Sequence, residues 1–556
     1  MDRSESFSVG TLHAAIAGLS PLKAFMLSLV CGILTVFAFA PFYFWPVFIL
    51  VISLLVWLVD GARTREKWGK AVFMRGWAYG IGFTLASMHW TAQPFLVNPE
   101  QHLAFIWMPL ILLPAGLGLF FGLGTLLAGR FWSRTPARVF AFATALAFTE
   151  LLRGTVFGGF PWNWSGMIWE PGSPVSQMAS LFGLWGLSAL TFLLAAAPAA
   201  MADYRREGSD FNRIFPLMVS AVIFASGWAW GTGRIMAAPA TEGTAVRIVD
   251  VEVRQDDKYP IDPEGRPVVT QQLRSQAATN ILRAYLIGTG DDFPDEPRLV
   301  VWPEAALPLP LLQDPNALDA VALRLGERSL IAGTARVDRY AEPQPEWYNS
   351  LAIIDARSRM RGANAIYDKN RLVPFGELSA ADIIPFGHSI SGILPGALQQ
   401  MATAGFTPGP EGSPLELNDG RSFLPLICYE ALFPGLVQRT LGEADFLVNI
   451  SIDSWFGTGI GPEQHYSQAR YRAIETGRPL VRAANLGYSG VVDVYGREVQ
   501  SNISANMVED LPVKVIDTIV PDYTIKTLFN QWSSYWTWLM LVLMNMVTFF
   551  YYRISA

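Results

Sequence analysis

The chain has 556 residues, of which 51% are hydrophobic and 16% are charged, and its formal net charge is −6. This composition is more apolar than that of a soluble globular protein and indicates residence in a membrane. A negative charge without a basic tract argues against nucleic acid as a partner. The two cysteines, Cys31 and Cys428, match no metal motif. We expect neither a metal nor a dissociable cofactor.

Apolar runs dominate the chain before Ala240 and return at its end. A bilayer core about 30 Å thick needs roughly 20 apolar residues per helix. We expect eight transmembrane helices, near residues 23–40, 42–59, 76–93, 103–128, 139–152, 175–200, 215–231 and 532–551. Between them, charged and turn-forming residues return at ordinary globular density. The sequence therefore predicts a membrane domain at 1–240, a soluble domain at 241–521 and a C-terminal transmembrane helix within 522–556.

The loops between the predicted helices alternate in charge, which predicts the orientation of the chain. Short loops rich in lysine and arginine stay in the cytoplasm, and such loops follow the second, fourth and sixth helices. The amino terminus is then cytoplasmic and the soluble domain lies outside, which in a bacterium is the periplasmic side of the inner membrane. A lone thiol in an oxidising compartment is exposed to oxidation unless it is shielded, so the presence of Cys428 there needs an explanation.

Two polar features lie near the outer end of the fifth predicted helix. Glu150 and Arg153 are three residues apart and can pair on one helix face, either as a structural ion pair or as a headgroup-binding site. The following loop, GGFPWNWSG at residues 158–166, contains Trp162 and Trp164. Tryptophan is typical of the interface between headgroups and acyl chains, so we expect this loop to anchor the protein there.

Short apolar runs rich in valine and isoleucine recur through the soluble domain, with helical segments between them. Strands are expected at 245–253, 298–304, 329–335, 348–356, 423–430, 445–453, 479–485 and 490–496, and helices at 268–286, 316–328, 434–441 and 462–476. Several of the strands are apolar enough to be buried on both faces. This alternation is typical of an α/β layered domain.

Three polar residues follow such strand-like runs, where α/β proteins commonly place their sites. Glu304 ends VVWPE, Lys369 ends AIYDK and Cys428 ends PLIC. Each of them alone is more often structural: a cap, a solvated lysine, or a small buried hydrophobe. Together they supply a base, a cation and a nucleophile.

The chemistry of these three groups is complementary. A free thiol has a pKa of about 8.5 and is mostly protonated at neutral pH, so attack on an acyl carbon needs a neighbouring base or cation. We expect Glu304 to accept the proton of Cys428 and Lys369 to stabilise the oxyanion, aided by a backbone N–H next to the cysteine. A histidine base is the alternative, but His465 is expected to pack or cap locally in a helix.

The order Glu, Lys, Cys at strand ends resembles the nitrilase superfamily, and the whole chain is similar to its membrane-bound branch, the apolipoprotein N-acyltransferase family. The similarity extends from FAFAPFYFWP, ELLRG and GGFPW to YDKNRLVPFGE, ICYEALFP and DSWFGTGIGPEQHYSQARYRAIETGRPLVRAANLG. It implies a four-layer αββα sandwich joined to the membrane helices. It also implies a Glu304–Lys369–Cys428 triad.

The resemblance implies a two-step acyl transfer between lipids. Cys428 would take an acyl chain from a phospholipid, typically phosphatidylethanolamine, as a thioester. The α-amine of the diacylglyceryl-cysteine of an apolipoprotein would then become an amide. Both partners are anchored in the bilayer. Water must be excluded from the thioester, and the apolar segment 383–396 is either a lid or ordinary packing.

Family knowledge also implies supporting roles for Glu377, Tyr429 and Glu430. The two glutamates are expected to hold the lysine or to order the substrate amine, although Glu430 is equally consistent with a salt bridge. The chain departs from the family pattern where Asp250, Glu252 and Tyr259 follow or lie in the first strand, and where Ile452 replaces a common asparagine. These departures affect the acyl pocket or the amine site rather than the triad.

Two other functions are consistent with parts of this pattern. A membrane-tethered amidase of the nitrilase type would use water as the acceptor, although a single helix would suffice as its tether. A transporter or lipid-binding protein would only recognise its cargo, but apart from Glu150 and Arg153 the predicted spans carry few charges.

Overall fold

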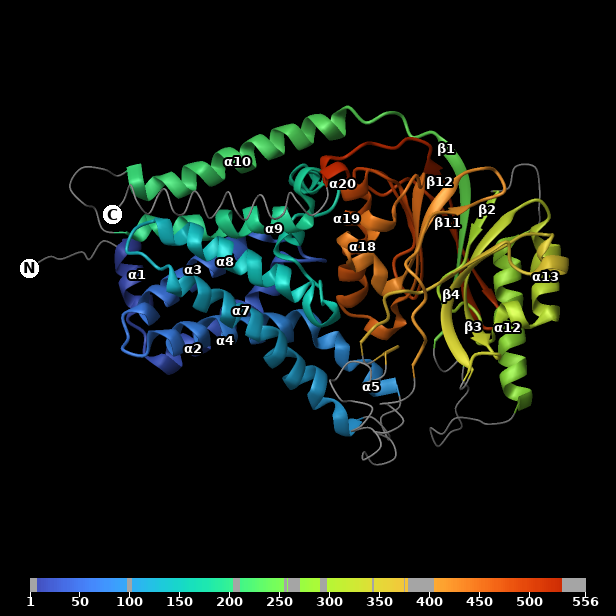
Figure 1. Ribbon diagram of the computed structural model, residues 1–556, viewed down its shortest axis with the longest axis horizontal. Helices are drawn as coiled ribbons and strands as arrows, with labels where there is room; N and C mark the ends of the chain where they lie inside the picture. The colour runs from blue at the N-terminus through green and yellow to red at the C-terminus, as the bar shows by residue number, and fades with distance from the viewer. Residues whose placement is uncertain are drawn as a thin grey trace, which may run out of the picture.

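The computed structural model describes residues 8–97, 103–203, 211–254, 258, 271–290, 298–342, 345–374, 376–378 and 405–532. α-Helices fill one half of the molecule and two β-sheets fill the other (Figure 1). The predicted helix at 532–551, apart from its first residue, and the segment 383–396 lie outside the described residues.

The helical half is a bundle whose members run along a common direction (Figure 1). Its helices are α1 (Val9–Ala17), α2 (Pro21–Thr35), α3 (Trp45–Arg63), α4 (Trp68–Met88), α5 (Pro94–Val97), α7 (Leu113–Arg130), α8 (Ala137–Arg153), α9 (Ala179–Ala196) and α10 (Phe211–Met236). A π-helical turn at Met108–Leu112 extends α7 at its start.

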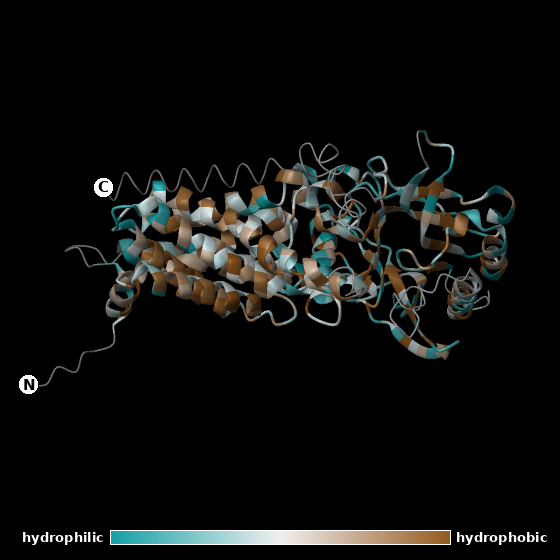
Figure 2. Cartoon of the chain, turned by 90° about the horizontal axis from the view of Figure 1, so that it is seen from below, coloured by the Kyte–Doolittle hydropathy of each residue, from teal (hydrophilic) through white to brown (hydrophobic). Residues whose placement is uncertain are grey.

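Five helical segments among the described residues are long and apolar enough to cross a membrane. They span Pro21–Ala38, Trp45–Arg63, Leu103–Arg130, Val175–Ala202 and Asn212–Met236. Two other predicted spans form helices, α4 and α8, that do not meet this standard: α8 has only 17 residues, and α4 is less apolar than the five. Figure 2 shows hydrophobic residues covering much of the bundle, whereas hydrophilic residues are frequent in the other half.

The boundary predicted for the third span is wrong. α4 begins at Trp68, not near residue 76, and so includes Lys70 and Arg75, which the sequence assigns to a loop. The helix tolerates Arg75 because its guanidinium donates a hydrogen bond of 3.1 Å to the carbonyl of Pro21. Glycine allows α4 to approach its neighbour closely: a Cβ atom on Gly80 would lie 2.7 Å from the Cα atom of Gly118 in α7.

The other half contains two sheets. The seven-stranded sheet has the order β11-β12-β1-β2-β3-β4-β5 and the five-stranded sheet has the order β10-β9-β8-β7-β6. The strands are β1 (Gly243–Val251), β2 (Leu299–Val301), β3 (Ser329–Asp338), β4 (Glu346–Ile354), β5 (Ala365–Asp368), β6 (Leu415–Glu416), β7 (Ser422–Ile427), β8 (Phe446–Ile452), β9 (Leu480–Asn485), β10 (Gly490–Val492), β11 (Asn502–Val508) and β12 (Leu511–Pro521).

Helices cover the outer face of each sheet, so this half has four layers in the order αββα. α12 (Gln271–Thr289) and α13 (Pro315–Leu325) pack on the seven-stranded sheet. α18 (Pro434–Thr440) and α19 (Gly461–Thr476) pack on the five-stranded sheet and form the layer that faces the bundle (Figure 1). Short helices α14 (Ser358–Arg361) and α20 (Leu528–Trp532) complete the described α-helices.

Strand β7 shows why the sandwich forms. It is buried on both faces, with Phe423 and Ile427 in the core between the two sheets and Leu424 and Leu426 in the core under α18 and α19. β7 pairs in parallel with β8 in a register that places Ile427 opposite Ile450. Parallel strands buried on both faces need such continuous apolar runs, and their carboxyl ends meet at the same edge of the sheet.

The expected role of Trp162 and Trp164 is wrong. Their exposed fractions are 2% and 1%, so neither faces lipid. Trp164 stacks on Trp185 of α9 at 5.5 Å, and the indole nitrogen of Trp162 donates a hydrogen bond of 2.9 Å to Gln464 of α19. The loop therefore packs between the bundle and the sandwich, where burying two large aromatic rings stabilises the junction.

Candidate active site

The three residues predicted at strand ends lie close together. Glu304 follows β2 and Lys369 follows β5, both in the seven-stranded sheet, whereas Cys428 follows β7 in the other sheet. The Nζ atom of Lys369 lies 3.4 Å from Oε1 of Glu304. Cys428 is within electrostatic reach of both charges. The two sheets thus contribute different members of one cluster.

One backbone N–H and one side-chain amide hold the carboxylate of Glu304, which is 4% exposed. The amide nitrogen of Ile452, the last residue of β8, donates a hydrogen bond of 2.9 Å to its Oε2 atom. The side-chain amide of Asn349 donates a bond of 2.6 Å to its Oε1 atom. In addition, the buried Lys258 donates to the carbonyl of Ala305 at 2.7 Å, and burial lowers the pKa of this lysine to about 8.

Lys369 lies between two carboxylates. Its Nζ atom is 2.8 Å from Oε2 of Glu377, and Asn349 donates a second hydrogen bond of 2.7 Å to Glu377. Burial by itself would lower the pKa of Lys369, but the charges of Glu304 and Glu377 outweigh it and raise the pKa above its ordinary value. The group is therefore a fixed ammonium ion, as expected for a residue that stabilises negative charge.

Cys428 has a backbone conformation that places its side chain at a sharp turn. Its φ is +50°, in the left-handed region that few non-glycine residues adopt, and it begins a short 3-10 helix, Cys428–Leu432. Ser451 follows Ile450 of β8, which pairs with Ile427 just before Cys428. Burial, and then the charge of Glu304, raises the pKa of the Cys428 thiol. A raised pKa favours the protonated thiol, so any attack by this sulfur would need a base.

Glu430 holds the turn rather than the lysine. Its buried carboxylate accepts hydrogen bonds from the backbone N–H of Ile427 at 2.8 Å, of Asn370 at 2.8 Å and of Arg371 at 3.1 Å, and from the hydroxyl of Tyr367 at 2.6 Å. These donors come from the end of β7 and from the segment that follows Lys369. Glu430 therefore sets the position of Cys428 relative to Lys369, a role that differs from the lysine contact and the salt bridge expected from the sequence.

Tyr429 faces the helical half. Its hydroxyl donates a hydrogen bond of 3.0 Å to the carbonyl of Gly159 in the loop after α8. Its ring packs at 5.0 Å against Phe433 and belongs to an apolar cluster with Met88, Trp90, Trp162, Leu432 and Leu436. The residue after the cysteine is thus part of the junction between the two halves.

A second cluster of buried charges, not predicted from the sequence, lies close to Cys428. Arg482 of β9 is 2.9 Å from Asp453, and His465 of α19 is 2.9 Å from the same carboxylate. All three side chains are at most 1% exposed. Burial and Arg482 lower the pKa of His465, and its Nδ1 atom faces Asp453, so it is not placed as the base of Cys428. The sequence offers one sign of this cluster: the strand-like runs NISID and PLVRAAN each contain a charged residue.

The departures from the family pattern have separate positions. Asp250 lies in β1 with 1% exposure, and burial followed by the charge of Glu252 raises its pKa well above the ordinary value. Ile452 contributes its backbone N–H to Glu304, which any residue type can supply except proline. Tyr259 lies outside the described residues.

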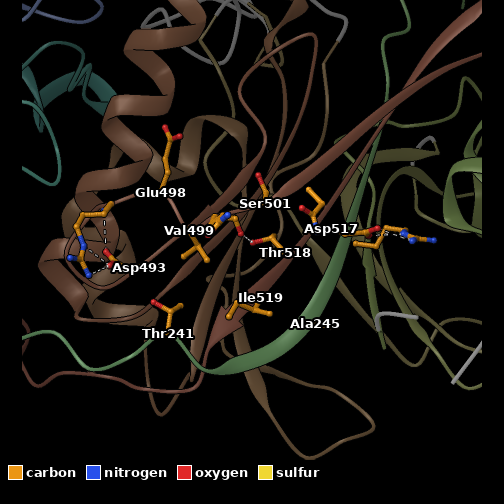
Figure 3. A pocket seen from close by; sticks show the side chains of 13 residues that line it. Thr241, Ala245, Asp493, Glu498, Val499, Ser501, Asp517, Thr518 and Ile519 are labelled. Atoms are coloured by element: carbon orange, nitrogen blue, oxygen red, sulfur yellow. Dashed lines mark hydrogen bonds and ion pairs between the residues drawn. The ribbon is translucent and has the colours of Figure 1, made fainter. Parts of the chain in front are cut away.

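The described residues contain no group of three or more histidine, cysteine, aspartate or glutamate side chains that could hold a metal ion. A cavity of about 830 Å³ opens elsewhere, along β12 and the segment 497–502. Figure 3 shows its lining, in which Asp493 and Asp517 are paired with arginines. None of the three strand-end residues lines it.

Comparison with known proteins gives two family matches. The model described as apolipoprotein N-acyltransferase N-terminal domain matches residues 31–197, and the model described as carbon-nitrogen hydrolase matches residues 296–504. The apolipoprotein N-acyltransferase of Rhizobium rhizogenes is 32% identical over 536 residues, which cover 94% of this chain and 95% of the relative. That of Brucella melitensis is 35% identical over 484 residues, which cover 84% of each chain.

Among solved structures, a mutant amidase of the nitrilase superfamily from Nesterenkonia AN1 is similar to this chain. The similarity covers 54% of this chain and 97% of the amidase, with 18% sequence identity and a TM-score of 0.31.

Proposed function

This chain belongs to the apolipoprotein N-acyltransferase family, to which it is related over 94% of its length, and on that premise we propose that it transfers an acyl chain from a phospholipid to the N-terminal cysteine of diacylglyceryl-modified apolipoproteins. The family assignment and the carbon-nitrogen hydrolase match support an acyltransferase that acts on lipoproteins. Phosphatidylethanolamine is the proposed donor, and Cys428 is the proposed acyl carrier.

In the first step, Glu304 accepts the proton of the Cys428 thiol as the sulfur attacks the ester carbonyl carbon of the phospholipid. The resulting oxyanion is stabilised by the ammonium group of Lys369 and by the backbone N–H of Tyr429. The bond between the carbonyl carbon and the glycerol oxygen then breaks. Glu304 returns the proton to that oxygen, which leaves a lysophospholipid and a thioester on Cys428.

In the second step, the neutral α-amine of the lipoprotein cysteine attacks the thioester carbonyl. Glu304 accepts the proton that the nitrogen loses and returns it to the sulfur as the carbon–sulfur bond breaks. The products are an amide and the free thiol of Cys428. A thioester is less stable than an amide, so this step is downhill.

The observation that carries the proposal is the placement of one fixed ammonium between two carboxylates beside a protonated thiol. Lys369 contacts Glu304 at 3.4 Å and Glu377 at 2.8 Å, and the charges of all three act on Cys428. The raised thiol pKa favours a mechanism in which proton transfer accompanies attack, because a resting thiolate is not available.

We further propose eight membrane crossings that place the catalytic domain in the periplasm, on the outer side of the bacterial inner membrane. The proposed domains are 1–240 in the membrane, 241–521 as the catalytic domain and 522–556 as the last crossing. This arrangement is supported by the charge alternation of the loops. It would let both lipid substrates reach the site by lateral diffusion.

Acyl transfer by the purified full-length protein tests the proposal. Incubation with phosphatidylethanolamine vesicles and a diacylated lipopeptide should give a triacylated peptide, and intact mass should reveal an acyl adduct on the protein in the absence of the peptide. Cys428→Ala should abolish both, whereas Cys31→Ala, which changes the other cysteine, should retain both. Normal turnover by Cys428→Ala refutes the assignment, and release of free fatty acid alone supports a hydrolase instead.

A further inference from the structure

Two charged side chains of α8 are buried. Glu150 and Arg153 are each 3% exposed, and their charged groups approach to 3.8 Å. Neither residue belongs to the triad or to the groups that contact it. Burying such a pair costs several kcal/mol of desolvation per ion, so the contacts that they make are informative about their role.

Both side chains form hydrogen bonds with the loop 158–166 in addition to facing each other. Arg153 donates hydrogen bonds to the carbonyls of Trp162 at 2.7 Å and Asn163 at 3.5 Å. Glu150 accepts from the backbone N–H of Ser165 at 3.0 Å and from its hydroxyl at 2.9 Å. The pair therefore fixes the middle and the end of the loop.

The same loop touches the residue that follows the nucleophile. The carbonyl of Gly159 accepts the hydroxyl proton of Tyr429 at 3.0 Å, and the ring of Phe160 lies 6.4 Å from the Tyr429 ring. A side chain on Gly159 would meet the carbonyl oxygen of Gly154 at 2.3 Å, and its φ is +80°, so this approach needs glycine.

The loop also touches the charge cluster on the other side of the nucleophile. The ring of Trp162 stacks on His465 at 5.7 Å. His465 contacts Asp453, which accepts the hydroxyl proton of Ser451 at 2.7 Å. Ser451 follows Ile450, which pairs with Ile427, the residue before Cys428, and its hydroxyl interacts with the Cys428 thiol. One loop thus contacts the surroundings of Cys428 by two independent routes (Figure 1 shows the chain after α8 lying against α18 and α19).

We propose that Glu150 and Arg153 are positioning residues for Cys428: by fixing the loop 158–166 they hold the nucleophile from the membrane bundle, through Tyr429 on one side and the His465–Asp453–Ser451 chain on the other. The α/β half then has a complete active site only when this loop is seated. The inference rests on the proposed role of Cys428 as the nucleophile. It resolves the two interpretations of the Glu150–Arg153 pair in favour of an internal role.

The test compares substitutions at the two ends of α8 in the full-length protein. Arg153→Gln removes the contacts with the loop, and Arg153→Lys keeps the charge but not the forked geometry that reaches two carbonyls. Arg138→Gln is the matched control, because Arg138 is 2% exposed and pairs with Asp203 at 2.6 Å at the opposite end of the helix. Trp162→Phe is a milder variant that keeps a ring against His465 and loses the bond to Gln464.

Alkylation of Cys428 by iodoacetamide, measured from pH 6 to 10 with Cys31 replaced by serine, reports on the nucleophile without any lipid substrate. Turnover of phosphatidylethanolamine and a diacylated lipopeptide, and thermal unfolding, are measured in parallel. A wild-type protein that shows no acyl transfer contradicts the proposed function, whereas the alkylation profile still tests the positioning role.

We expect Arg153→Gln to admit water around the thiol, so that its alkylation profile moves to lower pH while kcat falls by about 10-fold to 100-fold. Trp162→Phe should move the profile in the same direction by less, and Arg153→Lys should not restore it. Arg138→Gln should change thermal stability without moving the profile. An unchanged profile and kcat in Arg153→Gln, an equal shift in Arg138→Gln, or full rescue by lysine would each overturn the proposal.

Discussion

The neutral side-chain amide of Asn349 bridges the carboxylates of Glu304 and Glu377. Its amide nitrogen donates hydrogen bonds to Glu304 at 2.6 Å and to Glu377 at 2.7 Å. Two carboxylates that face one lysine repel each other, and a shared donor offsets part of that repulsion. The sequence could not identify it, because a single asparagine in the strand run YNSLAIIDA gives no sign of which groups will lie beside it.

Replacing Asn349 by alanine should lower turnover by about 100-fold, since one preorganised donor is lost from the site. The measurement is the rate of lipopeptide acylation, normalised to folded protein. Asn364→Ala is the matched control, because its amide donates a comparable bond of 2.8 Å to Asp355, remote from the triad. Equal losses in the two variants would contradict a specific role for Asn349.

Charge changes at the triad should move the titration of Cys428 in opposite directions. The thiol pKa is raised by burial and by Glu304, and it is lowered by Lys369. Glu304→Gln should therefore shift alkylation of Cys428 to lower pH, and Lys369→Met should shift it to higher pH. Both variants should nevertheless lose acyl transfer by about 100-fold or more, because one lacks the base and the other the cation. A shared direction of the two shifts would argue against this electrostatic arrangement.

At the scale of elements, predictions succeeded where one residue type dominates a run and failed where tertiary contacts decide. The valine-containing and isoleucine-containing runs of β1 and β8 and the apolar run of β7 indicate their strands directly. β11 and β12 are absent from the predicted strands. Asparagine and serine interrupt the apolar residues of the edge strand β11, and lysine and aspartate interrupt those of its neighbour β12. The sequence also predicts the lipid interface for Trp162 and Trp164. The preference of tryptophan for that interface cannot show that a ring packs against another part of the protein.

The end of β8 carries three adjacent functions. Ser451 lies beside the thiol, the N–H of Ile452 holds Glu304, and Asp453 anchors the strand end to Arg482 and His465. A shift of this strand end would therefore disturb both Glu304 and Cys428. Only the tertiary structure shows this arrangement, because no motif in the sequence links these three residues to Glu304 or Cys428.

Asp453→Asn tests the anchoring of β8. Burial alone would raise the pKa of Asp453, but Arg482 and His465 outweigh it and hold the pKa at about 2, against about 4 in an unfolded chain. This carboxylate therefore contributes stability that is fully present above pH ~4 and is lost as the pH falls through about 2. The variant should be less stable by about 3 kcal/mol near neutral pH.

The stability difference between the two proteins, followed by thermal unfolding from pH 6 down to pH 2, should shrink as the pH falls. A constant difference over that range would show that Asp453 is not ionised in the folded protein. Asp355→Asn is the control for loss of a carboxylate that interacts mainly with neutral donors.

At the scale of the whole molecule, the bundle and the sandwich share polar contacts as well as apolar surface. The hydroxyl of Tyr471 in α19 donates to the carbonyl of Gly166, Glu475 accepts from the backbone N–H of Leu184 at 2.7 Å, and Gln177 donates to the carbonyl of Tyr495 at 2.8 Å. These contacts hold the α18–α19 layer against the ends of the membrane helices. In the proposed orientation, the site would lie at the boundary where lipid substrates reside.

The proposed orientation predicts opposite accessibility for two surface positions. Lys67 is exposed in the segment between α3 and α4, at the basic end of the bundle, and Tyr340 is 95% exposed at the end of β3 in the sandwich. In a chain with Cys31→Ser and Cys428→Ala, we expect Tyr340→Cys to react with a membrane-impermeant maleimide in intact spheroplasts. Lys67→Cys should react only after permeabilisation, because short basic loops stay in the cytoplasm.

The unsubstituted background, which lacks both cysteines, measures non-specific labelling. Labelling of Lys67→Cys but not Tyr340→Cys in intact cells would place the sandwich in the cytoplasm, where a periplasmic lipoprotein substrate could not reach Cys428.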